Sequence, residues 1–452
     1  MVDNKYPVGL FDWTHLPNPL PEVGRRPATI EISVTPSSIK SELTKAAPSA
    51  LGAKALDGVP MLDLRRQYAQ IGAEVLAAVE RVCASQHYIL GAEVEAFERE
   101  LADFCGNGNA VGCASGTDAL WLALAAAGVQ PGDQVLTTPF SFFASASAIA
   151  RIGARPVFAD IDPLTFNLDP VQVESFLRRA KRDTLRALLP VHLYGQCADM
   201  NALQELAHEF HLSLIEDAAQ AIGARWGSER IKARNAGSMG VSAAFSFYPT
   251  KNLSAYGDAG LVTTNNPEIA EHMRRLRNHG SPRRYVHDEL GWNSRLDALQ
   301  AAILRVKLKY VEGWSEARRE RAATYDRLFI EAGLAKVSQS TNSDRQSALY
   351  ESGPIQLPHT AAAAHHVFHQ YVVRAYRRDE LREFLTARKI GTEVYYPIPL
   401  HLQPCFVCLG YREGDFPQAE RAAKEVLALP MFPELTEPEQ RRVVQSIADF
   451  YC

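Results

Sequence analysis

Two hydrophobic patterns alternate through residues 60–270. Short apolar runs of strand length end in polar residues, as in residues 185–192 and 241–248. Between such runs lie longer segments in which apolar residues recur at helical spacing, as in residues 64–83 and 91–104. This alternation is typical of a mostly parallel sheet with helices on both faces. The sequence therefore predicts an α/β fold whose ligand site lies at the carboxyl ends of the strands.

The pattern changes on both sides of this region. Residues 1–58 are rich in Pro, Ser and small residues and show no sustained periodicity, so we expect a poorly ordered extension. A long helix is predicted from 296 to 314, and a polar loop at 339–353. We therefore predict a large domain at residues 59–314 and a smaller C-terminal domain at 315–452.

Composition narrows the classes of protein. The chain has 452 residues, of which 46% are hydrophobic and 22% charged, with a formal net charge of −4. It has ample material for a core, and neither a nucleic acid nor a membrane is an expected partner. Seven cysteines, an odd number scattered along the chain, favour free thiols in a reducing compartment, so we expect a cytoplasmic location.

No metal site is expected. Cys405 and Cys408 form a C-x-x-C pair, but a zinc site needs two further ligands, and we interpret them as buried or half-buried thiols. His365, His366 and His369 lie close together with helix-like spacing. No acidic partner accompanies them, so they are interpreted as ordinary polar residues.

Lys251 stands where a ligand is expected. The strand predicted at 241–248 ends at Pro249, which gives a sheet no N–H donor. Ser246 precedes the lysine by five residues, and a glycine-rich turn follows it. A lone lysine after a strand is most often a surface residue, but these neighbours favour a lysine that meets a ligand.

Two other strand ends carry candidate chemistry. Ser115-Gly116-Thr117-Asp118 begins a predicted helix, whose N-terminus suits a phosphate, although such residues also serve simply as helix caps. The strand that ends at Glu216 and Asp217 delivers two carboxylates, either of which can serve as a helix cap.

These segments together resemble the DegT/DnrJ/EryC1/StrS family of sugar aminotransferases. The family pattern F-S-F-x-x-x-K-N-L-x-x-x-G-D-x-G is matched from Phe245 through Lys251-Asn252-Leu253 to Gly260. G-W-N-S-R-L-D at 291–297 and Y-Y-P-I-P-L-H at 395–401 also match, so the resemblance covers residues 60–452. It implies a fold type I transferase dependent on pyridoxal 5′-phosphate, with a mostly parallel seven-stranded sheet, a smaller C-terminal α/β domain, and a homodimer whose active sites are shared across the interface.

The resemblance also implies roles for individual residues. Lys251 binds the cofactor covalently, and Asp217, not Glu216, keeps the pyridine nitrogen protonated. The aromatic ring that stacks on the cofactor is Phe142, with Phe143 as the alternative. The further cofactor contacts implied are Ser115, Gly116, Thr117, Gln220, Ser246 and, from the partner subunit, the residue equivalent to Asn293. The substrate contacts implied are Tyr88, His192, Arg283, Arg284, Tyr285, Tyr396 and His401.

The activity implied is transfer of an amino group from L-glutamate, which leaves as 2-oxoglutarate, to a nucleotide-linked keto-sugar. The 291–297 segment and the H-L-Y-G-Q segment at 192–196 favour C3 of a dTDP- or UDP-linked sugar. A sister branch that removes a hydroxyl group carries histidine at the lysine position, so Lys251 argues against it. Two alternatives stay open: another fold type I enzyme, such as a lyase or dehydratase, and a regulatory protein that binds the cofactor without turnover.

Overall fold

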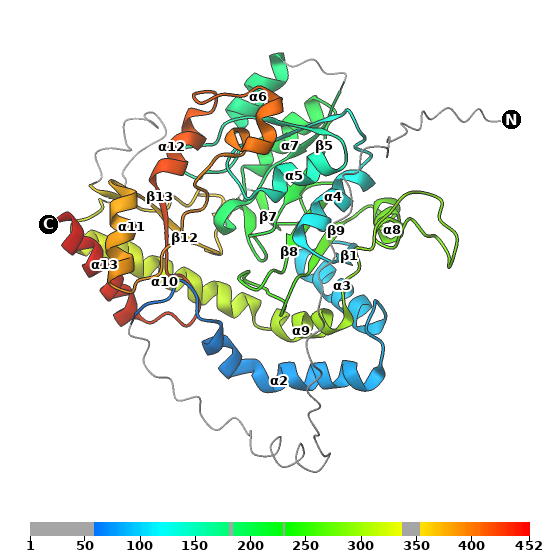
Figure 1. The fold of residues 1–452 in the computed structure, drawn as a ribbon, viewed down its shortest axis with the longest axis horizontal. Coiled ribbons are helices and arrows are strands. Elements are labelled where there is room, and N and C mark those ends of the chain that lie inside the picture. Colours follow the sequence, from blue (N-terminus) through cyan, green and yellow to red (C-terminus); the bar gives the residue numbers. More distant parts are fainter. Residues whose placement is uncertain (1–57, 180–183, 229–230, 337–352) are drawn as a thin grey trace, which may run out of the picture. The chain divides into compact units, whose positions relative to one another are not determined.

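The computed structural model describes residues 58–179, 184–228, 231–336 and 353–452 (Figure 1). The predicted N-terminal extension, apart from residue 58, lies outside the described residues. So does all but the last residue of the polar loop predicted at 339–353.

A seven-stranded sheet forms the centre of the fold, in the order β1-β9-β8-β5-β4-β2-β3. Strand β9 is antiparallel to both of its neighbours, and the other pairs are parallel. The predicted α/β fold with a mostly parallel seven-stranded sheet is thus confirmed. The strands are β1 (Asn109–Cys113), β2 (Gln134–Thr137), β3 (Arg155–Phe158), β4 (Leu185–Leu189), β5 (Ser213–Asp217), β8 (Ser242–Ser246) and β9 (Gly260–Thr264).

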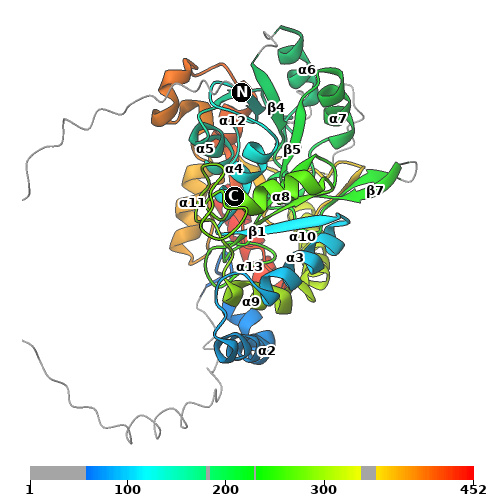
Figure 2. The same cartoon turned by 90° about the vertical axis from the view of Figure 1, so that its right-hand side faces the viewer.

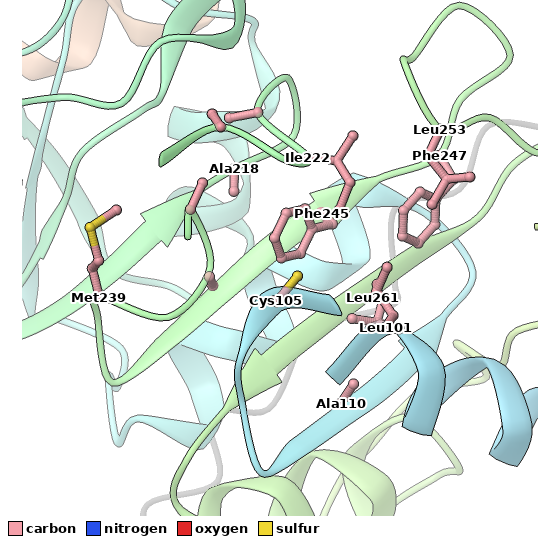
Figure 3. Packing of buried hydrophobic residues seen from close by; sticks show 14 of the residues in the cluster. Leu101, Cys105, Ala110, Ala218, Ile222, Met239, Phe245, Phe247, Leu253 and Leu261 are labelled. Atoms are coloured by element: carbon pink, nitrogen blue, oxygen red, sulfur yellow. The ribbon is translucent and has the colours of Figure 1, made fainter. Parts of the chain in front are cut away.

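Helices cover both faces of this sheet because the strands are apolar on both sides. In β8, Phe245 packs into one hydrophobic cluster with Leu101 of helix α3 (Figure 3). Its neighbour Ala244 points to the other face and packs with Leu120 of helix α4. The helices of this region are α2 (Leu64–Ser85), α3 (Ala92–Cys105), α4 (Gly116–Ala126), α5 (Ala144–Arg151), α6 (Pro170–Arg179), α7 (Met200–Glu209), α8 (Pro267–Leu276) and α9 (Ala298–Leu308), with a 3₁₀ turn η1 (Leu193–Gly195).

The long helix predicted from 296 to 314 is wrong, because the chain forms two helices there. Helix α9 ends at Leu308, and α10 (Val311–Glu331) begins after a turn in which the amide of Tyr310 donates to the carbonyl of Lys307 at 3.0 Å. The ring of Tyr310 stacks on Trp314 with centroids 5.6 Å apart. Neither Pro nor Gly marks the break, so tertiary packing imposes it.

The C-terminal part of the chain adds a second sheet, in the order β10-β12-β13, with α11 and α13 beside it (Figures 1 and 2). The predicted domain boundary at residue 314 falls inside α10, and the division into a large and a small domain stays a prediction. The elements are β10 (Ile355–Gln356), β12 (Tyr371–Ala375), α11 (Arg378–Ala387), the 3₁₀ helices η3 (Leu400–Leu402) and η4 (Pro404–Leu409), α12 (Pro417–Glu425), β13 (Val426–Leu429) and α13 (Glu437–Tyr451).

A third small sheet has the order β11-β6-β7. Its strands are β6 (Arg225–Ser228), β7 (Ile231–Asn235) and β11 (Ala364–His365). The three clustered histidines therefore lie on β11 and on the loop that follows it, not on a helix.

One buried ion pair joins elements on one side of the sheet. Arg277, just after α8, contacts Glu98 of α3 at 2.5 Å and donates to the carbonyl of Gly112 in β1 at 2.6 Å. The amide of Gly112 in turn donates to Glu98 at 2.8 Å. Both side chains are buried, and Nε of Arg277 has no hydrogen-bond partner in the described part of the chain.

We expect Arg277→Met to destabilise the protein by about 3–5 kcal/mol, because Glu98 then stays buried without a counter-charge. Urea unfolding followed by far-UV circular dichroism measures this change. Arg178→Met is the matched control, since Arg178 pairs with Glu174 at the surface and is exposed. If the two variants unfold at the same urea concentration, the Arg277–Glu98 pair does not stabilise the fold as expected.

Candidate active site

Loops from four strands meet at the carboxyl edge of the central sheet, as a parallel sheet requires. Ser115 follows β1, Phe142 follows β2, Asp217 ends β5 and Lys251 follows β8. Because β5 and β8 are neighbouring parallel strands, their ends deliver Asp217 and Lys251 to the same place.

Lys251 lies in the turn after β8, where its amide donates to the carbonyl of Tyr248 at 2.8 Å. Its side chain is half-buried. Burial lowers the pKa of the amine to about 8, and the charge of Asp217 opposes this shift. A fraction of the amine is therefore neutral near neutral pH, and the neutral form is the nucleophile.

Asp217 is buried beside that amine. The hydroxyl of Ser145 donates to Oδ2 at 2.7 Å, and the amide of Ala219 donates to Oδ1 at 3.2 Å. Burial raises the pKa of the Asp217 carboxyl, while these two donors and the charge of Lys251 act against it. Ser145, whose hydroxyl lies 2.9 Å from that of Ser141, is a supporting residue to which the sequence assigned no role.

Glu216 points the opposite way from Asp217, as adjacent residues of a strand do. It accepts the amides of Gly237 at 2.8 Å, Met239 at 2.7 Å and Gly240 at 2.6 Å. Burial alone would raise the pKa of Glu216, but its contact with His192 and the backbone donors lower it. Glu216 therefore fastens the turn that leads into β8, in agreement with the choice of Asp217 as the site carboxylate.

Two predicted substrate contacts turn out to be interior side chains. His192 is fully buried, with Nε2 at 2.9 Å from Glu216 and Nδ1 accepting the amide of Ala198 at 3.2 Å. His401 is 2% exposed, and its Nε2 lies 3.1 Å from Glu420. Both rings are therefore interior, which argues against the predicted substrate contacts, although Nδ1 of His401 has no hydrogen-bond partner among the described residues.

The N-terminus of α4 forms a cradle against β8. Ser115 caps the helix, and its hydroxyl accepts the amide of Asp118 at 3.1 Å. The amides of Gly116 and Thr117 have no recorded partner within the described part of the chain, as is usual for a helix start. A Cβ on Gly116 would lie 2.4 Å from the Cβ of Ser246, so the two segments touch. The helix end is therefore capped and still open to an anion.

In the structure, Phe142 and Phe143 have different surroundings, which the sequence alone could not predict. The ring of Phe143 packs 5.5 Å from that of Phe406 in η4. Phe142 is 57% exposed, and its ring lies 6.1 Å from that of Tyr396. Phe143 is 41% exposed, so Phe142 is the more exposed of the two rings, and its stacking on the cofactor stays a prediction.

Gln220 orients Tyr396. Its Oε1 accepts the amide of Tyr194 at 2.7 Å, and its Nε2 donates to the Tyr396 hydroxyl at 3.0 Å. The Tyr396 hydroxyl accepts this bond, so its own proton stays available for another acceptor. Burial raises the pKa of Tyr396, which keeps that proton in place at neutral pH.

Two buried side chains that the sequence analysis missed hold the loop around Lys251. His369 Nδ1 donates to Asn252 Oδ1 at 3.1 Å. Burial lowers the pKa of His369 far below its usual value, and the Lys251 charge adds to the effect. Because the histidines follow a strand that is distant in the chain, their spacing gave no sign of this contact.

The second is Lys307 of α9. Its Nζ donates to the carbonyl of Ser254 at 2.8 Å and to the hydroxyl at 2.7 Å, and it lies 4.8 Å from the ring centre of Tyr256. Burial lowers the pKa of Lys307 to about 8. In the sequence, Lys307 stands three residues after Leu304 on the apolar face of the predicted helix, and this position indicates a buried lysine.

The remaining predicted contacts lie at exposed positions. Arg283, Arg284 and Tyr285 occupy the exposed loop between α8 and α9, where Arg284 donates to the Tyr285 hydroxyl at 3.1 Å. Tyr88 is 38% exposed, and its carbonyl accepts the amide of Ala298 at 2.8 Å.

Asn293 is exposed and lines a hollow of about 360 Å³. The other residues that line it are Ile89, Ala114, Asp258, Arg295, Asp297 and Gln300. Lys251 and Asp217 are not among them.

The residues present fit pyridoxal phosphate. The aldehyde of the cofactor requires an amine that can be neutral, which fits Lys251, and its ring nitrogen requires a buried carboxylate, which fits Asp217. The phosphate requires an open helix N-terminus, which fits the Gly116–Ser246 cradle, and the face of the ring requires an aromatic side chain, which fits Phe142. No group of three or more His, Cys, Asp or Glu side chains arranged to hold a metal ion occurs among the described residues.

Comparisons with known proteins agree with this arrangement. The model of the DegT/DnrJ/EryC1/StrS aminotransferase family matches residues 69–448. A pleiotropic regulatory protein of Geobacillus stearothermophilus is 49% identical over 393 residues, 87% of this chain and 98% of that protein. A dTDP-3-amino-3,4,6-trideoxy-α-D-glucose transaminase of Streptomyces venezuelae is 44% identical over 392 residues, 87% and 96% of the two chains.

A solved structure is similar over the same region. DesV of S. venezuelae, crystallised in complex with a ketimine intermediate, superposes with a TM-score of 0.78 at 43% identity, covering 87% of this chain and 98% of that one. No helix in the described parts of the chain is both long and apolar enough to cross a membrane.

We expect capture of pyridoxal phosphate by the apoenzyme to accelerate as pH rises through about 8 and then to level off, because only the neutral amine of Lys251 attacks. Stopped-flow absorbance measures the rate, and a free amine of ordinary pKa corrects for titration of the cofactor. In Asp217→Asn the midpoint should fall, since the charge that favours the protonated amine is gone. A midpoint that stays in place or rises would contradict the pairing.

Gly116→Ala should weaken binding of the cofactor. The new methyl group would overlap Ser246, and such overpacking costs about 1–3 kcal/mol. If most of this cost falls on the cradle, the dissociation constant of pyridoxal phosphate rises about tenfold. Equilibrium titration of the apoenzyme measures it. Gly313→Ala is the control, because a Cβ at that position meets nothing within 4 Å. If Gly116→Ala and Gly313→Ala bind pyridoxal phosphate with equal affinity, the cradle at Gly116 does not bind the cofactor.

Proposed function

The chain belongs to the DegT/DnrJ/EryC1/StrS aminotransferase family, and from this premise we propose that it transfers an amino group from L-glutamate to a nucleotide-linked keto-sugar. Enzymes of this family depend on pyridoxal phosphate. The observation that carries the proposal is the half-buried amine of Lys251 beside the buried carboxylate of Asp217, at the ends of neighbouring strands.

The chain's own groups account for the proton and charge handling. Bound pyridoxal phosphate supplies an electron sink for the bond that breaks at the amino-bearing carbon. Lys251 both holds the cofactor and, once released, moves a proton, because a pKa of about 8 lets it act as base and then as acid near neutral pH. Asp217, fixed by Ser145, holds the ring nitrogen charged.

The cradle and the aromatic residues position the reacting groups. The open amides of Gly116 and Thr117, with Ser115 and Ser246 beside them, suit the phosphate, and Phe142 suits one face of the ring. Gln220 directs the Tyr396 hydroxyl towards the same space, where it can donate to the cofactor or to a sugar oxygen. Residues along one edge of the sheet thus suffice to orient both the cofactor and the sugar.

The sugar is proposed to be a 3-keto sugar linked to dTDP or UDP. The S. venezuelae relative, by its name, acts at C3 of a dTDP-linked sugar, which favours dTDP and this carbon. Arg283, Arg284 and Tyr285 stand exposed on one loop, and paired guanidinium groups suit a diphosphate. Tyr88 is the remaining proposed sugar contact.

We propose that the protein works as a homodimer. Asn293 is exposed and lines a hollow whose lining does not include Lys251, and this supports a contact between Asn293 and the partner's cofactor. Next to it, Trp292 is 38% exposed, and Tyr248 and Tyr256 are 53% and 45% exposed. Large aromatic side chains left exposed in this way favour burial between subunits.

Two finer points complete the proposal. The seven cysteines are free thiols in the structure, which favours a reducing compartment and a cytoplasmic location. The chain is proposed to divide into a large domain at 59–314, which carries the cofactor residues, and a small domain at 315–452, which contributes Tyr396.

One alternative has an observation in its favour. The relative from G. stearothermophilus bears the name of a regulatory protein and is 49% identical. A binding protein without turnover would keep the cofactor residues and still form no amino-sugar. A lyase of the same fold would cleave the amino acid instead.

The deciding experiment offers the purified enzyme ¹⁵N-labelled L-glutamate and a panel of dTDP- and UDP-linked 3-keto and 4-keto sugars. We expect the label in an amino-sugar, 2-oxoglutarate in equal amount, and no product with Lys251→Ala. That variant should also lack the yellow absorbance of the bound cofactor. Cleavage of the amino acid without any labelled sugar would support a lyase, and a yellow protein that glutamate does not bleach would support a regulatory protein.

A further inference from the structure

The C-x-x-C pair lies on η4 and differs from what the sequence predicted. Cys405 and Cys408 were expected to be buried or half-buried, and both are exposed. Helix η4 turns Phe406 inward, where it is 6% exposed and its ring packs on that of Phe143, while Val407 is 76% exposed.

The helix type places the two thiols on one side. A 3₁₀ helix has three residues per turn, so side chains at i and i+3 eclipse each other. The burial pattern follows this period, because Phe406 and Leu409 face inward while Cys405 and Cys408 face outward. Three rises of about 2 Å put their Cα atoms about 6 Å apart. Disulfide-bonded cysteines have Cα atoms at this spacing, and a bridge also brings their Cβ atoms to within about 4.5 Å.

Both ends of η4 are fixed to the rest of the fold. Before it, the amide of Leu400 donates to the carbonyl of Pro139 at 2.7 Å. At its end, Arg155 donates to the carbonyl of Leu409 at 2.9 Å. Gly410 closes the helix with a φ of 85°, and its amide donates to Val407 at 3.1 Å. The backbone that carries the two cysteines is therefore fixed on both sides of the pair.

The other cysteines lack this arrangement. Cys105, Cys113 and Cys197 are buried, and burial raises their thiol pKa values. Cys83 and Cys452 are exposed, but each lies on a separate helix end with no cysteine near it in the chain. Two sulfur ligands alone do not complete a metal site. The chemistry open to Cys405 and Cys408 is that of a dithiol.

We propose that Cys405 and Cys408 form a reversible dithiol–disulfide pair that reacts with low-molecular-mass disulfides. One thiolate attacks a sulfur of the small disulfide and releases one small thiol, leaving a mixed disulfide. The second thiolate then attacks the protein-bound sulfur of that mixed disulfide and releases the other small thiol. Two protein thiols are oxidised to one disulfide, and one small disulfide is reduced to two thiols.

The test exposes the holoenzyme to oxidised glutathione, blocks free thiols with iodoacetamide, and examines peptides by mass spectrometry without reduction. We expect the peptide that contains both cysteines to lose two hydrogen atoms and to escape alkylation. Dithiothreitol should restore both thiols, because an exposed disulfide is easily reduced. The readout is independent of catalysis, so it holds whatever substrate the enzyme takes.

Single substitutions separate a pair from two independent thiols. In Cys405→Ser, the remaining Cys408 should retain glutathione as a stable adduct, since the resolving thiol is missing; Cys408→Ser should do the same at Cys405. Cys83→Ser is the control and should leave the internal disulfide unchanged. If the native protein keeps both thiols alkylatable, or carries glutathione on each, the proposal is overturned.

Discussion

The electrostatic coupling between the buried Asp217 carboxylate and the Lys251 amine is the constraint on which the site depends. Burial acts on the two groups in opposite senses, since it raises the pKa of the acid and lowers that of the amine, and each charge resists the shift of the other. Neither group would suit the chemistry alone. A buried acid without the amine would tend towards its neutral form, and an amine in water would stay fully protonated at neutral pH. Neighbouring parallel strands bring the two together without a special loop.

The same strand that delivers Asp217 also secures the position of Lys251. Because side chains alternate along β5, Glu216 points to the other side of the sheet from Asp217. There it accepts three backbone amides from the turn that precedes β8, those of Gly237, Met239 and Gly240. The entry to β8 is thereby fixed, and β8 sets where Lys251 emerges. On the far side, Lys307 and His369 hold the loop that follows. The lysine is therefore held from both directions by buried polar contacts, each of them satisfied.

The C-terminal part of the chain completes the site through aromatic residues. Gln220 connects the amide of Tyr194 to the hydroxyl of Tyr396, whose ring lies near Phe142. Phe143 is taken by Phe406 of η4. Phe143 thus packs on η4, while the preceding residue, Phe142, is the one proposed to stack on the cofactor. Packing, and not chemistry, assigns these roles.

The sequence by itself determined what depends on local pattern. Strand and helix periods predicted the parallel sheet, and polar residues at strand ends marked Lys251 and the Glu216–Asp217 pair, because parallel strands bring their carboxyl ends to one edge. The family resemblance then selected Asp217 of the two carboxylates. Only the tertiary structure decided which way side chains of equal local character face. His192 is interior, Phe142 is exposed, and Cys405 and Cys408 face outward. The residues next to them in the sequence do not predict these orientations. The break before α10 has the same cause. Such orientations are set by contacts between segments distant in the chain, and a local pattern carries no information about the surface that will come to lie against it.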